Sequence, residues 1–276
     1  MPYCLLFPGQ GTQFPGMDAG LDLSGVDERL KNLMHAGPEE ELNQTAHAQP
    51  AVVSVSLALW HASEFKEPDL LMGHSLGEYT ALAAAGALRR DDAMALVTRR
   101  GEYMQASDPG VMAAVMGLER ERIDEALKGL DDVWIANINA PGQIVISGKE
   151  GAVSTAAGML KAQGGKVIPL KVRVASHCPL MRQAADRLAE YLDGVRLSKP
   201  VRGVVFNASA RTEEDPALIR TLLVKQLVSP VRWVESIEYA LSRGIDHFIE
   251  IGPRSVLAAM VRRIAPKARI ETRTVR

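Results

Sequence analysis

The sequence has few cysteines and no excess of either charge. Its 276 residues include only Cys4 and Cys178, which excludes a disulfide framework and is typical of a reducing compartment. The formal net charge of -1 argues against nucleic-acid binding, which normally needs a basic surplus. We therefore expect no nucleic-acid partner.

Long hydrophobic runs are also lacking. The most apolar region, residues 70–88, contains His74 and Glu78 and does not predict a membrane span. The N-terminus shows no basic segment followed by a long apolar stretch, so we expect no signal peptide. These features predict a cytoplasmic protein without membrane contact, and a monomer is the default expectation.

A G-x-S-x-G pentapeptide at 73–77 lies between an apolar strand predicted over 69–72 and an Ala-rich helix predicted over 78–88. This order is typical of a nucleophile elbow, in which glycines permit a sharp turn and the serine hydroxyl projects above the sheet edge. A serine that merely caps a helix would show the same pattern. Ser75 is the candidate nucleophile.

The chain begins with an apolar strand predicted over 3–7, followed by a loop rich in glycine and proline over 8–17. Such a loop can place a backbone N–H, here that of Gln10, opposite the nucleophile, or it can simply connect a strand to a helix. It lacks the spacing of the known phosphate-binding loops. Further helices are predicted over 38–42 and, starting at Gln49-Pro50, up to residue 60.

A helix predicted over 90–105 carries an arginine on its apolar stripe. Arg100 follows Leu96 and Val97 at helical spacing, whereas Arg99 points about 100° away. An inward guanidinium cannot lose its proton and is costly without an anion. The expected partner is a carboxylate, either from an Asp or Glu of this chain or from a ligand.

Residues 110–174 show the order strand, helix, strand, strand, helix, strand, which is the split βαβ arrangement. The predicted strands and helices are 111–118, 119–128, 133–138, 143–147, 150–163 and 166–174. We interpret 110–174 as a small domain inserted into an α/β domain formed by 1–109 and 175–276. On its last strand, Lys171 and Arg173 form a basic face, either solvated or in contact with a partner.

A histidine, His177, lies where the inserted segment returns to the larger domain. Clefts form at such junctions, and a neutral imidazole there is a candidate base for Ser75, although a lone histidine is more often structural. The other histidines show no paired spacing, so no metal site is expected. The C-terminal part predicts strands over 201–207 and 246–251 and helices over 216–228, 230–241 and 255–264.

Seven motifs in this order make the sequence resemble the malonyl-CoA:acyl carrier protein transacylases, the acyltransferase family of fatty acid and polyketide synthesis. The motifs are FPGQG at 7–11, GHSLGEY at 73–79, RG at 100–101 with MQ at 104–105, NINAPGQ at 137–143, SH at 176–177, Gln226 before Pro230-Val231, and EIGP at 250–253. The resemblance implies a hydrolase-like α/β core with a mostly parallel sheet and an inserted ferredoxin-like subdomain.

The resemblance also implies a catalytic set of Ser75, His177 and Gln226, in which a backbone carbonyl at Gln226 orients the histidine in place of an aspartate. The backbone N–H groups of Gln10 and Leu76 would form the oxyanion hole.

Four further positions are implied to contact the substrate. Arg100 would bind the free carboxylate of a malonyl group, and Asn137, Asn139 and Ser176 would line the substrate site. Many malonyl-specific members carry phenylalanine where Ser176 stands, and in the polyketide branch a small residue there accompanies bulkier extender units. Leu76, Glu78-Tyr79 and the similarity to stand-alone bacterial enzymes with serine at this position imply malonyl instead, so malonyl is expected, with methylmalonyl as the alternative. The segment between Met17 and Pro38 is also shorter than is usual.

The implied reaction moves malonyl from malonyl-CoA to the phosphopantetheine thiol of an acyl carrier protein, through a malonyl-serine. No metal or cofactor is expected, because the CoA thioester is a substrate. Other readings are a trans-acting polyketide acyltransferase, the acyltransferase subunit of a malonate decarboxylase, a non-enzymatic module, and a serine esterase that uses Ser75 with His247 and an acid, Asp246 or another.

Overall fold

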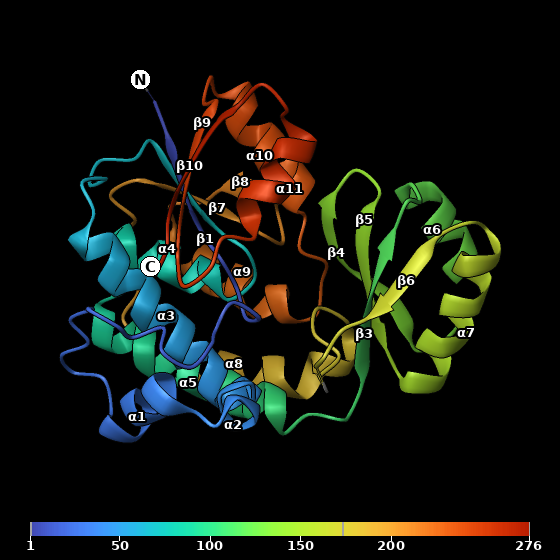
Figure 1. The fold of residues 1–276 in the computed structure, drawn as a ribbon, viewed down its shortest axis with the longest axis horizontal. Helices are drawn as coiled ribbons and strands as arrows, with labels where there is room; N and C mark the ends of the chain where they lie inside the picture. The colour runs from blue at the N-terminus through green and yellow to red at the C-terminus, as the bar shows by residue number, and fades with distance from the viewer. Residues whose placement is uncertain (1, 173, 276) are drawn as a thin grey trace.

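The computed structural model describes residues 2–172 and 174–275, which form two β-sheets (Figure 1). The strands of the larger sheet are β1 (Cys4–Phe7), β2 (Leu70–Gly73), β7 (Gly203–Phe206), β8 (Arg211–Thr212), β9 (His247–Ile251) and β10 (Arg269–Arg273). Their order is β10-β9-β1-β2-β7-β8, and only β8 runs antiparallel. The predicted α/β class with a mostly parallel sheet is confirmed.

Helices cover both faces of this sheet, so β1 and β2 are buried along their whole length. One face packs on α3 (Thr45–Ala62), α4 (Gly77–Ala84), α5 (Arg90–Gln105), α8 (Arg182–Asp193) and α9 (Pro216–Leu227). The other face packs on α10 (Trp233–Ser242) and α11 (Leu257–Ile264). Two short helices, α1 (Glu28–Ala36) and α2 (Glu39–Leu42), pack outside α3.

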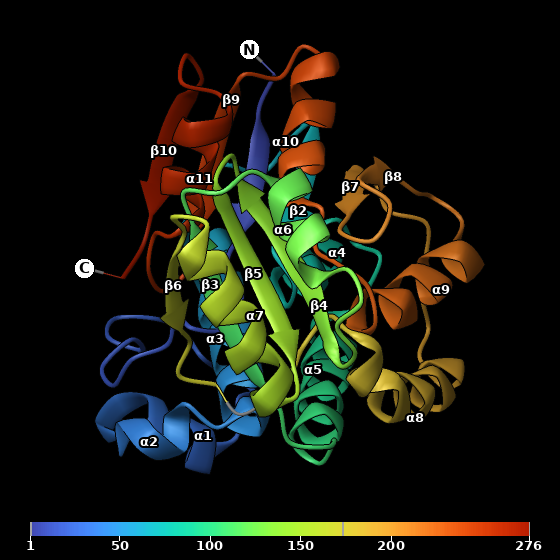
Figure 2. The same ribbon diagram turned by 90° about the vertical axis from the view of Figure 1, so that its right-hand side faces the viewer.

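The second sheet belongs to the predicted insertion and has the ferredoxin-like order β4-β5-β3-β6, with every pair antiparallel. Its elements are β3 (Val111–Met116), α6 (Arg120–Leu127), β4 (Val133–Ala140), β5 (Gln143–Gly148), α7 (Glu150–Ala162) and β6 (Lys166–Pro169). Helices α6 and α7 cover its outer face (Figure 2), and its inner face looks toward the larger sheet. The domain boundaries at 110 and 174 stay a prediction.

The bounds of several predicted elements differ from the structure: the helix predicted over 78–88, for example, is α4 and ends at Ala84. Helix α3 does not start at Gln49-Pro50 but at Thr45, because Pro50 lies early in the helix, where a missing N–H removes a single backbone hydrogen bond. The strand predicted over 166–174 ends at Pro169. The basic strand face is therefore wrong for Lys171, and Arg173 lies outside the described residues.

Helix α8 and strands β8 and β10 were not predicted. Strand β10 is a mostly charged edge strand, so it lacks the apolar run by which a buried strand is recognised. None of the helices within 2–172 and 174–275 combines the length and the apolar character that crossing a membrane requires.

Candidate active site

Ser75 lies in a sharp turn between β2 and α4. Its backbone φ of 51° falls in the left-handed region, which is strained for a residue with a side chain. The flanking glycines are required by close packing: a Cβ at Gly73 would meet the backbone of Gly77 at 1.8 Å, and one at Gly77 would meet the carbonyl oxygen of Phe7 at 2.0 Å. The turn therefore has the geometry of a nucleophile elbow.

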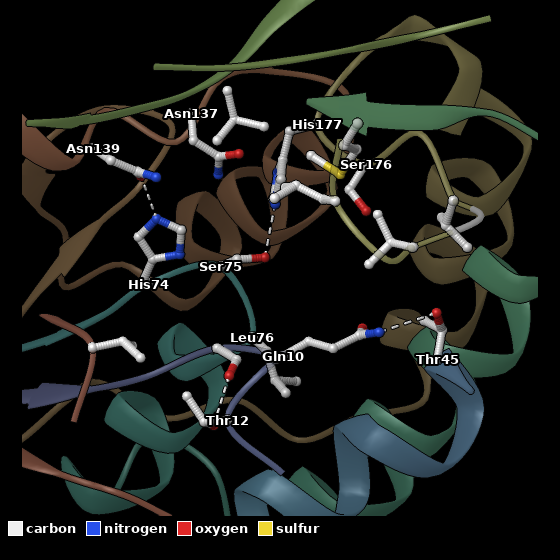
Figure 3. A pocket seen from close by; sticks show the side chains of 18 of the residues that line it. Gln10, Thr12, Thr45, His74, Ser75, Leu76, Asn137, Asn139, Ser176 and His177 are labelled. Carbon is white, nitrogen blue, oxygen red and sulfur yellow. Dashed lines mark hydrogen bonds between the residues drawn. The ribbon is translucent and has the colours of Figure 1, made fainter. Parts of the chain in front are cut away.

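The hydroxyl of Ser75 faces the imidazole of His177 (Figure 3), with 2.7 Å between Oγ and Nε2. On the other side of the ring, Nδ1 lies 2.8 Å from the backbone oxygen of Gln226. A carbonyl oxygen only accepts, so Nδ1 carries the proton and Nε2 is left to accept the Ser75 hydroxyl proton. The histidine is thus oriented so that it can act as a base without an aspartate.

His177 is 3% exposed and stays neutral over the physiological pH range. Burial, followed by the nearby positive charge of Arg100, lowers the pKa of His177 to about 3, although the hydrogen bond to Gln226 acts in the opposite direction. A neutral imidazole is the form that can accept a proton from Ser75.

The backbone amides of Gln10 and Leu76 belong to the two loops that meet at Ser75. Within the described part of the chain, neither amide donates a hydrogen bond to a protein acceptor. The Leu76 amide also lies at the N-terminus of α4, where the helix dipole favours negative charge. Both amides are available to an oxyanion.

Arg100 is 1% exposed, and its guanidinium lies beside the nucleophile. Nη2 is 3.4 Å from Ser75 Oγ and 3.0 Å from Gln226 Oε1, and Nη1 is 2.8 Å from Gln49 Oε1. Both amide oxygens are neutral, and no carboxylate within 2–172 or 174–275 forms a salt bridge with this guanidinium. Of the two expected partners, an internal acid is therefore excluded among these residues.

A cavity of about 280 Å³ opens above Ser75 between the two sheets. Asn137, Asn139 and Ser176 line it (Figure 3). Of the residues described above, Gln10, Ser75, Leu76, Arg100 and His177 also line it. A β-bulge after Ile135 in β4 shifts the alternation of side chains, so Asn137 and Asn139 face the cavity while Ile138 packs under α6 and α7. Asn139 Oδ1 accepts a hydrogen bond from His74 Nε2, 2.8 Å away.

Three polar residues at the site were not assigned a role from the sequence. Gln49 contacts Arg100, and Asn207 and Glu78 form a buried hydrogen-bond network beneath the elbow. Burial raises the pKa of Glu78 to about 8, against the opposing effects of Asn207, Gln226 and Arg100. Asn207 follows β7 as Ser75 follows β2, and that position after a strand is the only signal the sequence offers.

The esterase alternative with His247 is wrong. His247 is the first residue of β9, whereas Ser75 follows the last residue of β2. Because strands β9, β1 and β2 are parallel, the two residues lie at opposite ends of these strands. His247 contacts Glu271 instead, at 2.9 Å.

Lys171 is exposed and lines a second cavity of about 780 Å³, next to the first.

Comparisons with known proteins agree with this geometry. The family model described as acyl transferase domain matches residues 4–275. The malonyl CoA-acyl carrier protein transacylases of Escherichia coli K12 and Bacillus subtilis 168 are 41% and 40% identical, over 95% and 94% of this chain and 92% and 89% of theirs.

Solved structures give the same result. The malonyl CoA-acyl carrier protein transacylase of Coxiella burnetii superposes with a TM-score of 0.93 at 38% identity, covering 100% of this chain and 94% of that one. A malonyl-transacylase in complex with a type II PKS acyl-carrier protein gives 0.92 at 39% identity, with 100% and 96% covered. The chain belongs to the acyl transferase domain family and is an acyltransferase of the malonyl CoA-acyl carrier protein transacylase group.

Proposed function

We propose that this acyltransferase moves a malonyl group from malonyl-CoA to the phosphopantetheine thiol of an acyl carrier protein. The observation that carries the proposal is the buried guanidinium of Arg100, with Nη2 3.4 Å from Ser75 Oγ and only neutral amide oxygens as partners. The acyl group of a simple ester carries no negative charge that could pair with this guanidinium. An acyl group ending in a carboxylate supplies the missing anion next to the reacting atom.

In the first half-reaction, Ser75 Oγ attacks the thioester carbonyl and His177 Nε2 takes its proton. The oxyanion formed is stabilised by the amides of Gln10 and Leu76. The carbon–sulfur bond then breaks, the proton passes from His177 to the departing CoA sulfur, and malonyl-serine remains.

In the second half-reaction, His177 takes the proton of the pantetheine thiol, whose sulfur attacks the malonyl-serine ester. The carbon–oxygen bond breaks, and His177 returns the proton to Ser75 Oγ. The scheme is ping-pong, and this chain contributes only its own side chains and backbone amides to it. We propose that the chain itself uses no metal or cofactor, since the phosphopantetheine belongs to the carrier protein.

Relatives named as malonyl CoA-acyl carrier protein transacylases, and one solved in complex with a carrier protein, support both proposed substrates. Asn137 makes no side-chain hydrogen bond with the described residues and faces the cavity, so its amide is free for the bound thioester. We further propose a cytoplasmic enzyme, in keeping with its cysteine usage, and a monomer as the default state.

Intact mass measured after brief mixing with malonyl-CoA tests the proposal. The wild type should gain one malonyl group, Ser75→Ala should gain none, and added carrier protein should remove the adduct and become malonylated. Acetyl-CoA and methylmalonyl-CoA in parallel define the acyl group. Equal labelling by acetyl-CoA, or no adduct with any donor, would contradict the proposal.

A further inference from the structure

Asn207 is a buried side chain that touches the nucleophile elbow from the neighbouring strand. It is 1% exposed and follows β7 directly. Met72 in β2 pairs with Val205 in β7, so the residues just after these two strands meet at the same edge of the sheet. This places Asn207 beside the turn that holds Ser75.

The side chain of Asn207 bridges two backbone groups of that turn. Its Oδ1 accepts from the backbone N–H of Ser75 at 2.6 Å, and its Nδ2 donates to the backbone oxygen of Gly73 at 2.7 Å. The side-chain amide of Gln226 donates to the backbone oxygen of Ser75 at 3.0 Å. Both peptide groups of the strained serine are therefore held by buried side chains.

Asn207 is itself held in place by a hydrogen bond to Glu78. Its backbone N–H donates to Glu78 Oε2 at 2.6 Å, and Glu78, on α4, is fully buried. Helix α4 starts at the elbow, so this bond ties the end of β7 to the first turn of the helix that follows Ser75. The charged or titratable groups that reach this network are Glu78, Arg100 and His177, the last two through Gln226.

The bond to Asn207 occupies the backbone N–H of Ser75 and leaves the next one in the turn without an acceptor among the described residues. The N–H of Ser75 is occupied, whereas that of Leu76, the next residue, has no acceptor in the described chain. A positive φ at Ser75 sets the direction in which the following amide points. Loss of the bridge would let the turn relax and would misplace both Ser75 Oγ and the Leu76 amide.

We propose that Asn207 is a positioning residue, which holds the Ser75 turn in its reactive conformation and so aims the nucleophile and one oxyanion donor. This rests on the proposed function, in which Ser75 is acylated. Asn207 acts through Ser75 and touches no substrate, so its loss should slow the chemical step while malonyl-CoA binding at Arg100 is kept.

The test compares serine acylation by rapid-quench mass spectrometry in the wild type, Asn207→Ala and a control. Asn207→Ala should lower the rate at saturating malonyl-CoA by about 10²-fold, since small misplacements of reacting groups have effects of that size. The malonyl-CoA concentration giving half the maximal rate should change less than about threefold. Val115→Ala, on the outer face of the inserted sheet, controls for lost stability and should keep the wild-type rate.

Asn207→Asp provides a second, independent test if Asn207→Ala does not fold. An ionised carboxylate keeps an acceptor for Ser75 but repels the oxygen of Gly73, whereas a protonated carboxyl donates to it. Acylation by Asn207→Asp should therefore recover as the pH falls from 8 to 5.5, with no such rise in the wild type.

A wild-type acylation rate in Asn207→Ala, or a raised half-saturating concentration at an unchanged maximal rate, would overturn the positioning role, as would a pH-independent Asn207→Asp, and the proposed function would stand. If the wild type forms no adduct on Ser75, the proposed function itself fails.

Discussion

Arg100 and His177 approach the same oxygen atom from different parts of the chain. Nη2 of Arg100 lies 3.4 Å and Nε2 of His177 lies 2.7 Å from Ser75 Oγ. The cation that would hold the acyl carboxylate therefore lies next to the base, and its charge helps to keep that base neutral. In the proposed reaction, this arrangement would couple substrate binding to proton transfer, and the first two predictions rest on it.

Replacing Arg100 should change which acyl group is accepted. Arg100→Ala removes the cation opposite the malonyl carboxylate, and breaking such a buried charge pair typically costs 2–5 kcal/mol, roughly 30-fold or more. The ratio of malonyl to acetyl labelling of Ser75 should fall by about 10²-fold, measured by intact mass with equal donor concentrations. Arg99→Ala is the matched control, because Arg99 is exposed and pairs with Glu102. An unchanged ratio in Arg100→Ala would show that the carboxylate binds elsewhere.

The acylation rate should be insensitive to acid over a wide range. Burial and Arg100 lower the pKa of His177 to about 3, so the free enzyme keeps a neutral base well below pH 6. We expect kcat/KM for Ser75 acylation to stay flat from pH 8 to pH 5, where an unperturbed histidine of pKa about 6.5 would lose about 30-fold.

The same pH profile, measured for Arg100→Gln and for the wild type with acetyl-CoA as the donor, tests the contribution of Arg100. Without the guanidinium charge, the pKa of His177 should rise, and the acid limb of the profile should move to higher pH than in the wild type. A wild-type profile that falls with an apparent pKa near 6.5 would mean that the base is solvated during the reaction.

Glu78 should make stability fall as the pH rises. Burial raises its pKa from 4.5 to about 8, so between these values the folded protein binds a proton that the unfolded chain has released. Unfolding free energy from this residue is highest below pH 4.5 and is lost as the pH rises toward 8. At ~1.4 kcal/mol for each pKa unit, the loss is a few kcal/mol.

Glu78→Gln keeps an acceptor for Asn207 and cannot ionise, so it is the matched variant. Urea unfolding at pH 5 and pH 8.5 should show the difference in stability between Glu78→Gln and wild type shifting in favour of the variant at the higher pH. All other titrating groups are shared by the two proteins. A difference that stays constant with pH would show that Glu78 keeps one charge state.

Lys171 is exposed at the second cavity, which shares Gln10 and Thr45 with the first. If the acidic carrier protein approaches on this side, Lys171→Glu should raise its apparent KM by about threefold to tenfold, with a smaller effect at high salt. Lys161→Glu, on the outer helix α7, is the control. Hydrolysis of the malonyl adduct should be unaffected, and an unchanged KM would place the carrier elsewhere.

Much of the fold was readable in the sequence because its signals are local. Helix α5 begins and ends at the predicted residues 90 and 105, and the ferredoxin-like order of the insertion is confirmed. Errors occurred where local signals mislead: Pro50 lies inside α3, and the strand predicted to reach residue 174 ends at Pro169. The charged strand β10 gave no apolar pattern to detect.

For the site, the sequence by itself determined the elbow and the inward arginine. The spacing of glycines around Ser75 and the helical spacing of Arg100 from Leu96 and Val97 are properties of single elements. Only the tertiary structure decided that Arg100 meets the neutral oxygens of Gln49 and Gln226, and that Asn207 secures the elbow from 132 residues away. Those contacts depend on which strands and helices lie side by side, and packing of the whole chain, not any local pattern, sets that order.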